Sequence, residues 1–303
     1  RAGVGHLLIV DRDVVEEKNL RNQAYRPDDV GRPKADVLAE RTRGQHPGVA
    51  VEARTANLEE LPLGLFAAGV VLGALDSRRA RQALVSDIAW PLGVPVVDGG
   101  VGEGLLGRVQ VFLPGPASAC LECGWGRDDY RRLAEEYPCT GTETNGPATV
   151  APAFSGAVVA GLMAAEAVRI LSGGAPTESQ EIAFDLMHRR FLVSRLRRAP
   201  RCRFDHGIVR EVLRLSRPFT AATVGDLLEA VERRFGEAPV HMEVRPGLFG
   251  QGGFGAGRFV TPDHLRRYAG ERLAALGFVP EDRIRVRSTA ESAFVVLRMN
   301  EGA

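Results

Sequence analysis

Residues 1–115 alternate between short apolar runs and longer stretches in which apolar positions recur with a helical period. The apolar runs predict strands at residues 6–11, 49–54, 69–77, 94–100 and 107–115. Helices are predicted to begin near Pro33, because proline suits a first helical turn, and over residues 78–90. Strands alternating with helices of this length are typical of an α/β fold with a doubly wound, mostly parallel, Rossmann-like sheet. In such a sheet ligands bind at the carboxyl ends of the strands, where we expect Asp11, Asp76 and Asp98.

The middle of the chain contains a polar, glycine-rich stretch followed by a long apolar one. Residues 124–148 predict a loop, and residues 149–172 predict a helix. The apolar part of this helix is short for a membrane span and contains Pro152 and Gly156, so a buried core helix is the better interpretation. Residues 181–196 predict strand segments on the far side of the sheet.

The character of the sequence changes near residue 207. The elements predicted there are an amphipathic helix at 223–236 capped by Thr223, a flexible glycine-rich loop at 246–259, a second helix at 263–277 ending at Gly277, and strands at 283–288 and 293–299. We therefore expect two domains, residues 1–206 and a small α+β domain at 207–303. The second has a β-grasp character, and a partner-docking role is our hypothesis for it.

Composition narrows the functional classes. Apolar residues make up 45% of the chain and charged residues 25%, and the net charge is +1, so neither a nucleic acid nor a membrane is expected as a partner. Lys18 and Lys34 are the only lysines, which makes Lys34 a candidate for phosphate binding. No signal peptide is visible, so we expect a cytoplasmic protein whose cysteines serve a metal or catalysis rather than disulfides.

Polar groups follow the first strand at fixed spacings. The sequence reads D-x-D-x-V-x-x-x-N-L-x-x-Q from Asp11 to Gln23 and D-x-G-x-x-K from Asp29 to Lys34. By itself, an acid at a strand end such as Asp11 is as consistent with a helix cap as with a ribose-binding carboxylate. The whole string closely resembles the ThiF/MoeB/HesA family of E1-like activating enzymes, which adenylate the C-terminal glycine of a ubiquitin-like or sulfur-carrier protein with MgATP.

Further stretches match the family in the same order. They are residues 72–84, 94–115, 119–125, 147–173 and 197–202. The resemblance covers the chain to about residue 206 and implies an E1/ThiF-type fold and an ATP- and Mg²⁺-dependent adenylyltransferase. It further implies a cytoplasmic homodimer that acts on a ubiquitin-like protein, a sulfur-carrier protein or a ribosomal peptide.

The resemblance also implies a role for each residue that matches the family's motif. Asp11 would bind the ribose, Asn19 and Lys34 the phosphates, and Asp76 the magnesium. The implied ATP-binding set is Asp11, Asp13, Asn19, Arg21, Lys34 and Asp76, and the implied catalytic set is Asp76, Lys34 and Cys139. Positioned cations of this kind stabilise the charge that develops when a carboxylate attacks the α-phosphate.

Two features depart from the family at the phosphate site. Asn22 stands where the family has a phosphate-side arginine, and Arg21 or Arg26 would substitute for it. The family's glycine-rich phosphate loop belongs ahead of the residues that begin at Arg1, so we expect it, with an N-terminal arginine supplied by the partner subunit, in a preceding segment.

The cysteines divide into a metal set and one further thiol. Cys120 and Cys123 have the spacing of half a tetrahedral zinc site, and Cys202 and His206 offer the other half in place of the family's second Cys-x-x-Cys. We expect a structural Zn²⁺ on these four residues; a zinc-free set of buried thiols is the alternative. In the family, a cysteine at the place of Cys139 takes the carrier as a thioester or persulfide adduct, and a plain loop cysteine is the other interpretation.

Two other functional classes are alternatives to an adenylyltransferase. A degenerate E1-like scaffold that binds a peptide or carrier without using ATP is favoured by Asn22 and by the glycine loop's absence from these residues. A nicotinamide dehydrogenase would use the same kind of sheet, but the sequence supplies no glycine fingerprint for it.

Overall fold

The computed structural model of the chain describes residues 3–102, 105–135, 152–236, 238–246, 248, 259–289 and 291–297. The chain divides into two compact units. Unit 1 comprises Arg1–Leu58 and Gly69–Gly207, and unit 2 comprises Glu59–Ala68 and Ile208–Ala303. The inclusion of Glu59–Ala68 in unit 2 was not predicted from the sequence, because this segment lies between two strands of unit 1.

Unit 1 contains parallel and antiparallel strand pairs. Its strands are β1 (His6–Val10), β2 (Ala50–Arg54), β3 (Val71–Gly73), β4 (Val96–Val101), β5 (Leu106–Phe112), β6 (Gln180–Asp185) and β7 (Arg190–Arg195). The β1–β2 and β3–β4 pairs are parallel, whereas β4, β5, β6 and β7 are joined by antiparallel pairing in the order β3-β4-β5-β6-β7. The predicted α/β class is therefore confirmed, with a sheet of mixed pairing.

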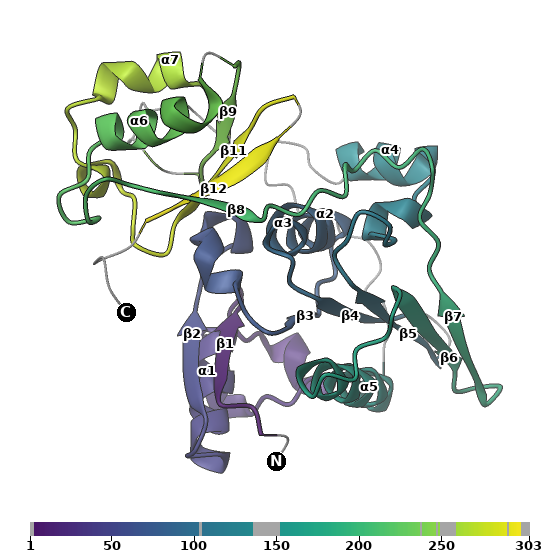
Figure 1. Cartoon of the computed structure of the whole chain (residues 1–303). Helices are drawn as coiled ribbons and strands as arrows, with labels where there is room; N and C mark the ends of the chain where they lie inside the picture. The colour runs from purple at the N-terminus through teal and green to yellow at the C-terminus, as the bar shows by residue number, and fades with distance from the viewer. Residues whose placement is uncertain are drawn as a thin grey trace. The chain divides into compact units, whose positions relative to one another are not determined.

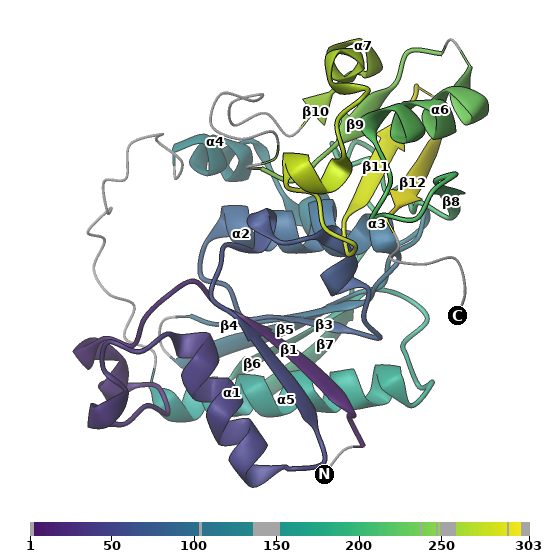
Figure 2. The ribbon, with the colours of Figure 1, turned by 90° about the vertical axis from the view of Figure 1, so that its left-hand side faces the viewer.

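The helices of unit 1 lie on both faces of these strands (Figures 1 and 2). They are α1 (Lys34–Gln45), the continuous helical stretch of α2 (Arg78–Gln82), a π-helical segment (Ala83–Ala89) and α3 (Trp90–Leu92), then α4 (Arg127–Glu135) and α5 (Ala153–Leu171). Figure 2 shows α1 and α5 on one side of the strands and α2 and α3 on the other, the three-layer arrangement of a doubly wound fold. Short 3₁₀ turns, among them η1 (Glu17–Arg21) and η7 (Leu121–Gly124), connect these elements.

Helix α5 covers β4 and β5 with one face only. Val159 and Met163 pack into a core with Val97, Val109 and Val111 of the sheet. The other face is exposed, so the predicted core helix is buried on one side. Among the described residues, α5 alone is long and apolar enough to cross a membrane by length and composition, a test that the core helix of a soluble protein also passes.

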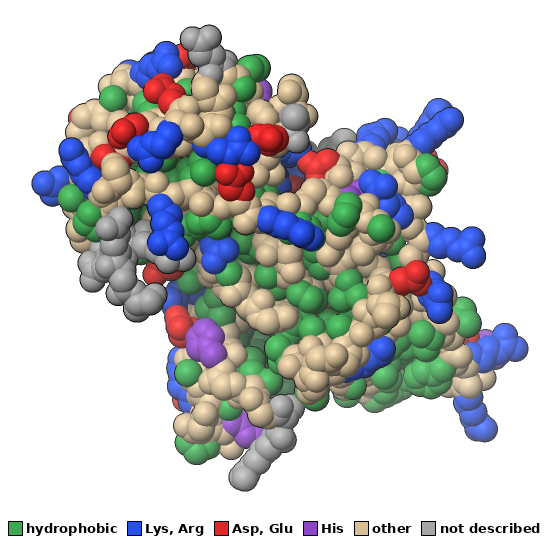
Figure 3. Space-filling view, in the orientation of Figure 1, with side chains coloured by type: hydrophobic (Ala, Val, Ile, Leu, Met, Phe, Trp, Pro, Cys, Tyr) green, Lys and Arg blue, Asp and Glu red, His purple; other side chains and the backbone are tan. Residues whose placement is uncertain are grey.

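Strand β7 lies at the edge of the sheet and is exposed along most of its length. Its side chains Phe191, Leu192 and Val193 are about 60% exposed, as is Met187 in the preceding turn. Figure 3 shows hydrophobic side chains at the molecular surface over this end of the sheet, with cationic side chains at the margin.

Unit 2 is a five-stranded mixed sheet packed against a helix, in agreement with the predicted α+β character. Its elements are β8 (Glu211–Arg214), α6 (Val224–Phe235), β9 (His241–Glu243), β10 (Phe259–Val260), α7 (Pro262–Leu265), β11 (Arg283–Arg287) and β12 (Ser292–Val296), with strand order β10-β9-β11-β12-β8. Thr223 caps α6 as predicted, in a reciprocal capping box with Asp226. The inserted segment docks through Gly64, whose amide donates to the Glu281 carbonyl at 2.9 Å.

Three predictions of local structure were wrong. Residues 127–135, expected in a loop, form helix α4. The second helix predicted at 263–277 is three short turns instead, although Gly277 ends the last of them with φ +89°. Asp98 lies within β4 rather than at its end. The glycine-rich loop predicted at 246–259 falls almost entirely outside the described residues.

Candidate functional site

The carboxyl end of β1 brings together three of the predicted residues. Asp11 directly follows the strand, and its Oδ1 accepts a hydrogen bond from the Asp13 amide at 2.9 Å. Lys34, the first residue of α1, places Nζ 3.1 Å from Asp13 Oδ2, and its amide donates to the Asp13 carbonyl at 2.9 Å. The Lys34 side chain is only 13% exposed, whereas Asp13 is 52% exposed. The result is an ammonium paired with the Asp13 carboxylate, and Asp13 is joined to Asp11 through its amide.

The 3₁₀ turn η1 presents the two further residues predicted at this site. Asn19 is buried and accepts a hydrogen bond from the Glu16 amide through Oδ1 at 2.9 Å, which fixes the turn. Arg21 is exposed at the end of the same turn. Asn19 therefore has a structural role in this turn, and its phosphate-binding role stays a prediction.

Tyr25 is a neighbour of Asp11 that the sequence analysis missed. Burial, followed by the negative charge of Asp11, raises the pKa of the Tyr25 phenol. The guanidinium of Arg41 lies 5.9 Å from the centre of the ring. No motif signalled this tyrosine, because its place beside Asp11 depends on how the chain folds back after η1.

Asp76 lies three residues beyond β3 in the loop of residues 74–77 that leads to α2. Its side chain is exposed at the carboxyl end of the strand, as predicted. Ser77 is the N-cap of α2, because its hydroxyl accepts a hydrogen bond from the Ala80 amide at 3.0 Å. Asp76 therefore directly precedes the residue that caps the N-terminus of α2.

Asp98 is buried within β4 and paired with a cation from α2. Arg81 Nε donates to Asp98 Oδ2 at 2.9 Å, and Arg81 Nη2 donates to Gln110 Oε1 at 3.0 Å. Burial raises the pKa of Asp98 above its ordinary value, although the hydrogen bond and the charge of Arg81 oppose this. Asp98 was predicted among the strand-end acids, and its pairing with Arg81 was not predicted.

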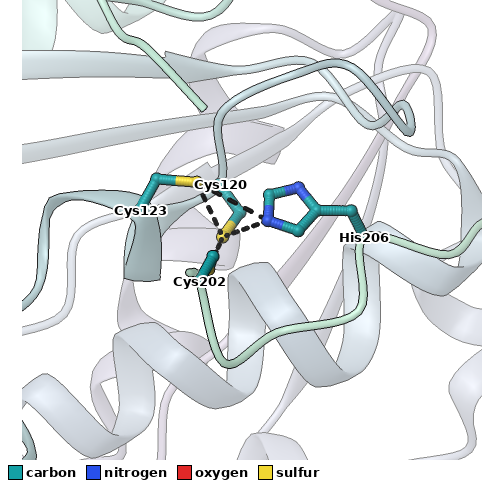
Figure 4. Close-up of side chains that lie close together, drawn as sticks. All are labelled: Cys120, Cys123, Cys202 and His206. Atoms are coloured by element: carbon teal, nitrogen blue, oxygen red, sulfur yellow. Dashed lines mark hydrogen bonds between the residues drawn. The ribbon is translucent and has the colours of Figure 1, made fainter. Parts of the chain in front are cut away.

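The four predicted metal ligands lie together (Figure 4). Their ligand atoms, three Sγ and His206 Nε2, all lie within 4.8 Å of one another. Cys120 Sγ is 3.8 Å from Cys123 Sγ and 3.7 Å from Cys202 Sγ, and His206 Nε2 is 3.5 Å from the sulfurs of Cys120 and Cys123. Tetrahedral zinc with bonds of about 2.3 Å to sulfur and about 2.05 Å to nitrogen separates its ligands by about 3.8 Å (S to S) and about 3.6 Å (S to N). The side chains therefore have the spacing that a metal such as zinc requires.

The surroundings of this cluster are apolar and aromatic. His206 is fully buried with a positive φ of 61°, and its ring packs edge-on against Trp90 with centroids 5.3 Å apart. Burial raises the pKa of the Cys120 thiol, with the neighbouring Cys123 and Cys202 adding to the effect. Burial, followed by the charge of Arg198, lowers the pKa of His206, which favours the neutral imidazole that binds metals.

Helix α4 is attached to the same region of unit 1. Tyr130 donates to Glu122 Oε2 at 2.9 Å, and the guanidinium of Arg203 lies 4.0 Å from the centre of the Tyr130 ring. An ion pair joins Asp129 to Arg78 of α2. Cys139, the predicted catalytic cysteine, lies outside the described residues.

The fold and these sites define an α/β protein with an acid- and lysine-bearing strand end and a Cys₃His cluster. Residues 1–204 match the model of the ThiF family, and the chain belongs to this family. The chain is 35% identical over 209 residues to the sulfur carrier protein adenylyltransferase of Thermus thermophilus, covering 66% of this chain and 73% of that protein. It is 32% identical to the SAMP-activating enzyme E1 of Haloferax volcanii, covering 66% of this chain and 71% of that protein.

A third relative is the molybdopterin-synthase adenylyltransferase of Escherichia coli, 29% identical over 205 residues that cover 66% of this chain and 77% of that protein. Among solved structures, E. coli MccB with ATP matches with a TM-score of 0.52 and 17% identity, over 66% of this chain. This chain spans about three-fifths (59%) of that MccB chain, and the likeness shows the fold alone. Family and relatives confirm the predicted resemblance and the class, an E1-like adenylyltransferase.

Proposed function

We propose that this protein adenylates the C-terminal carboxylate of a carrier protein or peptide. In this reaction a carboxylate oxygen of the acceptor bonds to the α-phosphorus of ATP, the bond from that phosphorus to the bridging oxygen breaks, and pyrophosphate leaves. The observation that carries the proposal is the nearly buried Lys34 ammonium, paired with Asp13, whose amide donates to Asp11 at the carboxyl end of β1, in a chain of the ThiF family. The names of the relatives support the same reaction.

Each residue of the strand end has a role in this proposal. Asp11 accepts the ribose hydroxyls, since it directly follows a parallel strand. Lys34 donates to the phosphates, and Asp13 orients it while the site is empty of nucleotide. Asn19 and Arg21 approach the phosphates from η1. Positioned donors of this kind stabilise the charge that develops at the α-phosphate.

Asp76 is the magnesium ligand in this proposal. Its exposed carboxylate fits Mg²⁺, which proteins bind through one or two carboxylates together with substrate phosphates. When bound, Mg²⁺ offsets negative charge on the triphosphate. The side chain of Asp76 orients the ion from the end of β3.

The Cys₃His cluster is a structural zinc site in this proposal. Cys120, Cys123, Cys202 and His206 supply four ligands and leave no position for a reacting group, which distinguishes a structural from a catalytic site. Zn²⁺ would join the segment after β5 to the segment that ends unit 1. Cys139 remains the proposed acceptor of the activated carrier.

The acceptor is a ubiquitin-like or sulfur-carrier protein, or a ribosomal peptide, and the protein acts in the cytoplasm. A homodimer is part of the proposal, because the outer face of α5 leaves Phe154 and Leu171 about half exposed. Unit 2, with Phe259 60% exposed at a sheet edge, is the proposed docking domain for a partner.

ATP–pyrophosphate exchange tests the proposal on the protein in its full natural length. We expect exchange that depends on an acceptor with a free C-terminus and is absent when that terminus is amidated. Lys34→Ala is expected to lower the rate by about 100-fold or more, because an oriented charge next to the reacting phosphate is removed. Lys18→Ala, at the chain's other lysine, is the matched control and is expected to leave the rate unchanged, since Lys18 is 73% exposed.

One observation favours a second candidate, the E1-like scaffold that binds an acceptor without ATP turnover. Asn22 is exposed at the position of the family's phosphate-side arginine and carries no charge. Binding of an acceptor without any exchange, in the wild-type protein, would support the scaffold and contradict adenylation.

A further inference from the structure

Asp98 of β4 contacts both ends of the loop that carries Asp76. Before the loop, Gly73 is the direct partner of Asp98 in the parallel pairing of β3 with β4. After the loop, Arg81 of α2 donates to Asp98 Oδ2 through Nε at 2.9 Å and also through Nη2. The segment from Gly73 to Arg81, which contains the loop of residues 74–77, is therefore held at both ends by one buried carboxylate.

The contact before the loop leaves little room for a side chain at Gly73. A Cβ at Gly73 would lie 3.0 Å from Asp98 Oδ1 and 3.1 Å from Leu84 Cδ2. Glycine at this position lets β3 lie directly against the carboxylate, so the end of the strand has little freedom to move. Asp98 Oδ1 is buried and has no hydrogen-bond partner among the described residues, so the carboxylate is oriented by its other oxygen and by this packing.

The contact after the loop is a charged pair removed from water. The side chain of Arg81 is 14% exposed and that of Asp98 is 2% exposed. Gln110 fixes the same guanidinium from β5 by accepting from Nη2 at 3.0 Å, and Gln110 in turn donates to Glu181 of β6 at 2.6 Å. Three neighbouring strands thus hold Arg81, and with it the first turns of α2, in one position.

We propose that Asp98 is a positioning residue that sets the orientation of Asp76 toward magnesium. This inference rests on the proposed function, because it assigns Asp76 the metal. Asp98 itself is buried and does not touch the ion or the nucleotide. It acts by fixing Gly73, three residues before Asp76, and Arg81, five residues after Asp76. Residues that hydrogen-bond a metal ligand directly commonly contribute about 10- to 100-fold to metal affinity, and the lower end of that range is expected for Asp98, which acts through Gly73 and Arg81.

Hydrogen exchange in the nucleotide-free, full-length protein tests the positioning directly. Asp98→Ala is expected to speed amide exchange in residues 74–82 by about tenfold or more, because the charged hydrogen bonds that hold α2 are lost. Asp98→Asn keeps the shape and one acceptor oxygen and is expected to give a smaller increase. Glu243→Ala is the matched control, since it removes a buried carboxylate from a pair with Arg285 in unit 2. Unchanged exchange in residues 74–82 of Asp98→Ala would overturn the positioning role.

Calorimetry of ATP binding with and without Mg²⁺ tests the link to the metal. Asp98→Ala is expected to reduce the Mg²⁺-dependent gain in affinity by about tenfold and to leave Mg²⁺-free binding unchanged. In the background of Asp76→Ala, the same substitution is expected to have no further effect, since the two residues act through one ion. Additive losses would contradict the link. A wild-type protein that binds no MgATP would overturn the proposed function. The hydrogen-exchange result would still decide whether Asp98 positions the loop.

Discussion

Replacing one ligand of the Cys₃His cluster should distinguish a zinc site from a zinc-free group of buried thiols. Cys202→Ser is the preferred change, because the hydroxyl nearly preserves the volume of the thiol but is a poor zinc ligand. Cys202 lies 3.7 Å from Cys120, so the substitution removes one corner of the tetrahedron without opening a cavity. The expected result is loss of tightly bound zinc from the purified protein.

The size of the effect follows from linkage. A metal that binds only the folded state and is present at 1,000 times its dissociation constant adds about 4 kcal/mol to the free energy of unfolding. In a unit of this size each kcal/mol shifts the melting temperature by about 2–4 °C, so chelation should lower the wild-type transition by roughly 8–16 °C. Cys202→Ser is expected to melt at the lower temperature with or without chelator.

The assay combines metal analysis with thermal denaturation, each with and without chelator. Cys139→Ser is the matched control, since Cys139 is the one cysteine outside the proposed ligand set, and this variant should retain one zinc per chain. Retention of zinc by Cys202→Ser with wild-type affinity would refute the ligand assignment. A wild-type melting temperature that does not respond to chelation would refute the stabilising role.

Three further predictions concern unit 2. Thr223→Ala should lower its free energy of unfolding by about 1 kcal/mol, measured by urea denaturation, because the N-cap of α6 is lost. Burial acts to raise the pKa of Asp226, but hydrogen bonds from Thr223 and Ser216 lower it overall. The ionised carboxylate therefore stabilises the fold above the ordinary pKa of about 3.9, and this stabilisation is lost as the pH falls through the lowered pKa. Asp226→Asn should reduce the loss of stability at acid pH, and an unchanged dependence of stability on acid pH would contradict the assignment. Gly64→Ala should destabilise unit 2 and leave zinc binding unchanged, since the new Cβ would lie 2.2 Å from the Glu281 carbonyl oxygen; an unchanged midpoint would show that the inserted segment is not part of the unit.

The elements predicted correctly are those with local signals. Helix α1 begins after Pro33 because proline suits the residues around a helix start, and α6 begins after a threonine cap. The two halves of the Cys₃His cluster were recognisable from ligand spacing, although Cys120 and His206 are 86 residues apart. The strand end after β1 was recognisable because its acids and lysine form a dense family motif.

The elements that were missed depend on contacts between distant parts of the chain. Helix α4 is short and strongly charged, so its few apolar positions give a weak sequence signal, and its attachment comes from Glu122 and Arg203 on either side of it in the sequence. A strand end was predicted at Asp98 because the apolar run stops there, but antiparallel pairing with β5 extends β4 to Val101. The partner of Asp98 is Arg81, on a helix 17 residues earlier, which no spacing rule identifies.

Isotope transfer from acceptor to nucleotide tests the central claim most directly. An acceptor whose C-terminal carboxylate carries ¹⁸O is incubated with ATP and the full-length protein, and the AMP that forms is analysed by mass spectrometry. If the carboxylate attacks the α-phosphorus, later attack at the acyl carbon leaves one carboxylate oxygen on AMP, so labelled AMP is the expected result. Unlabelled AMP, or no AMP in the presence of a bound acceptor, would contradict adenylation by this protein.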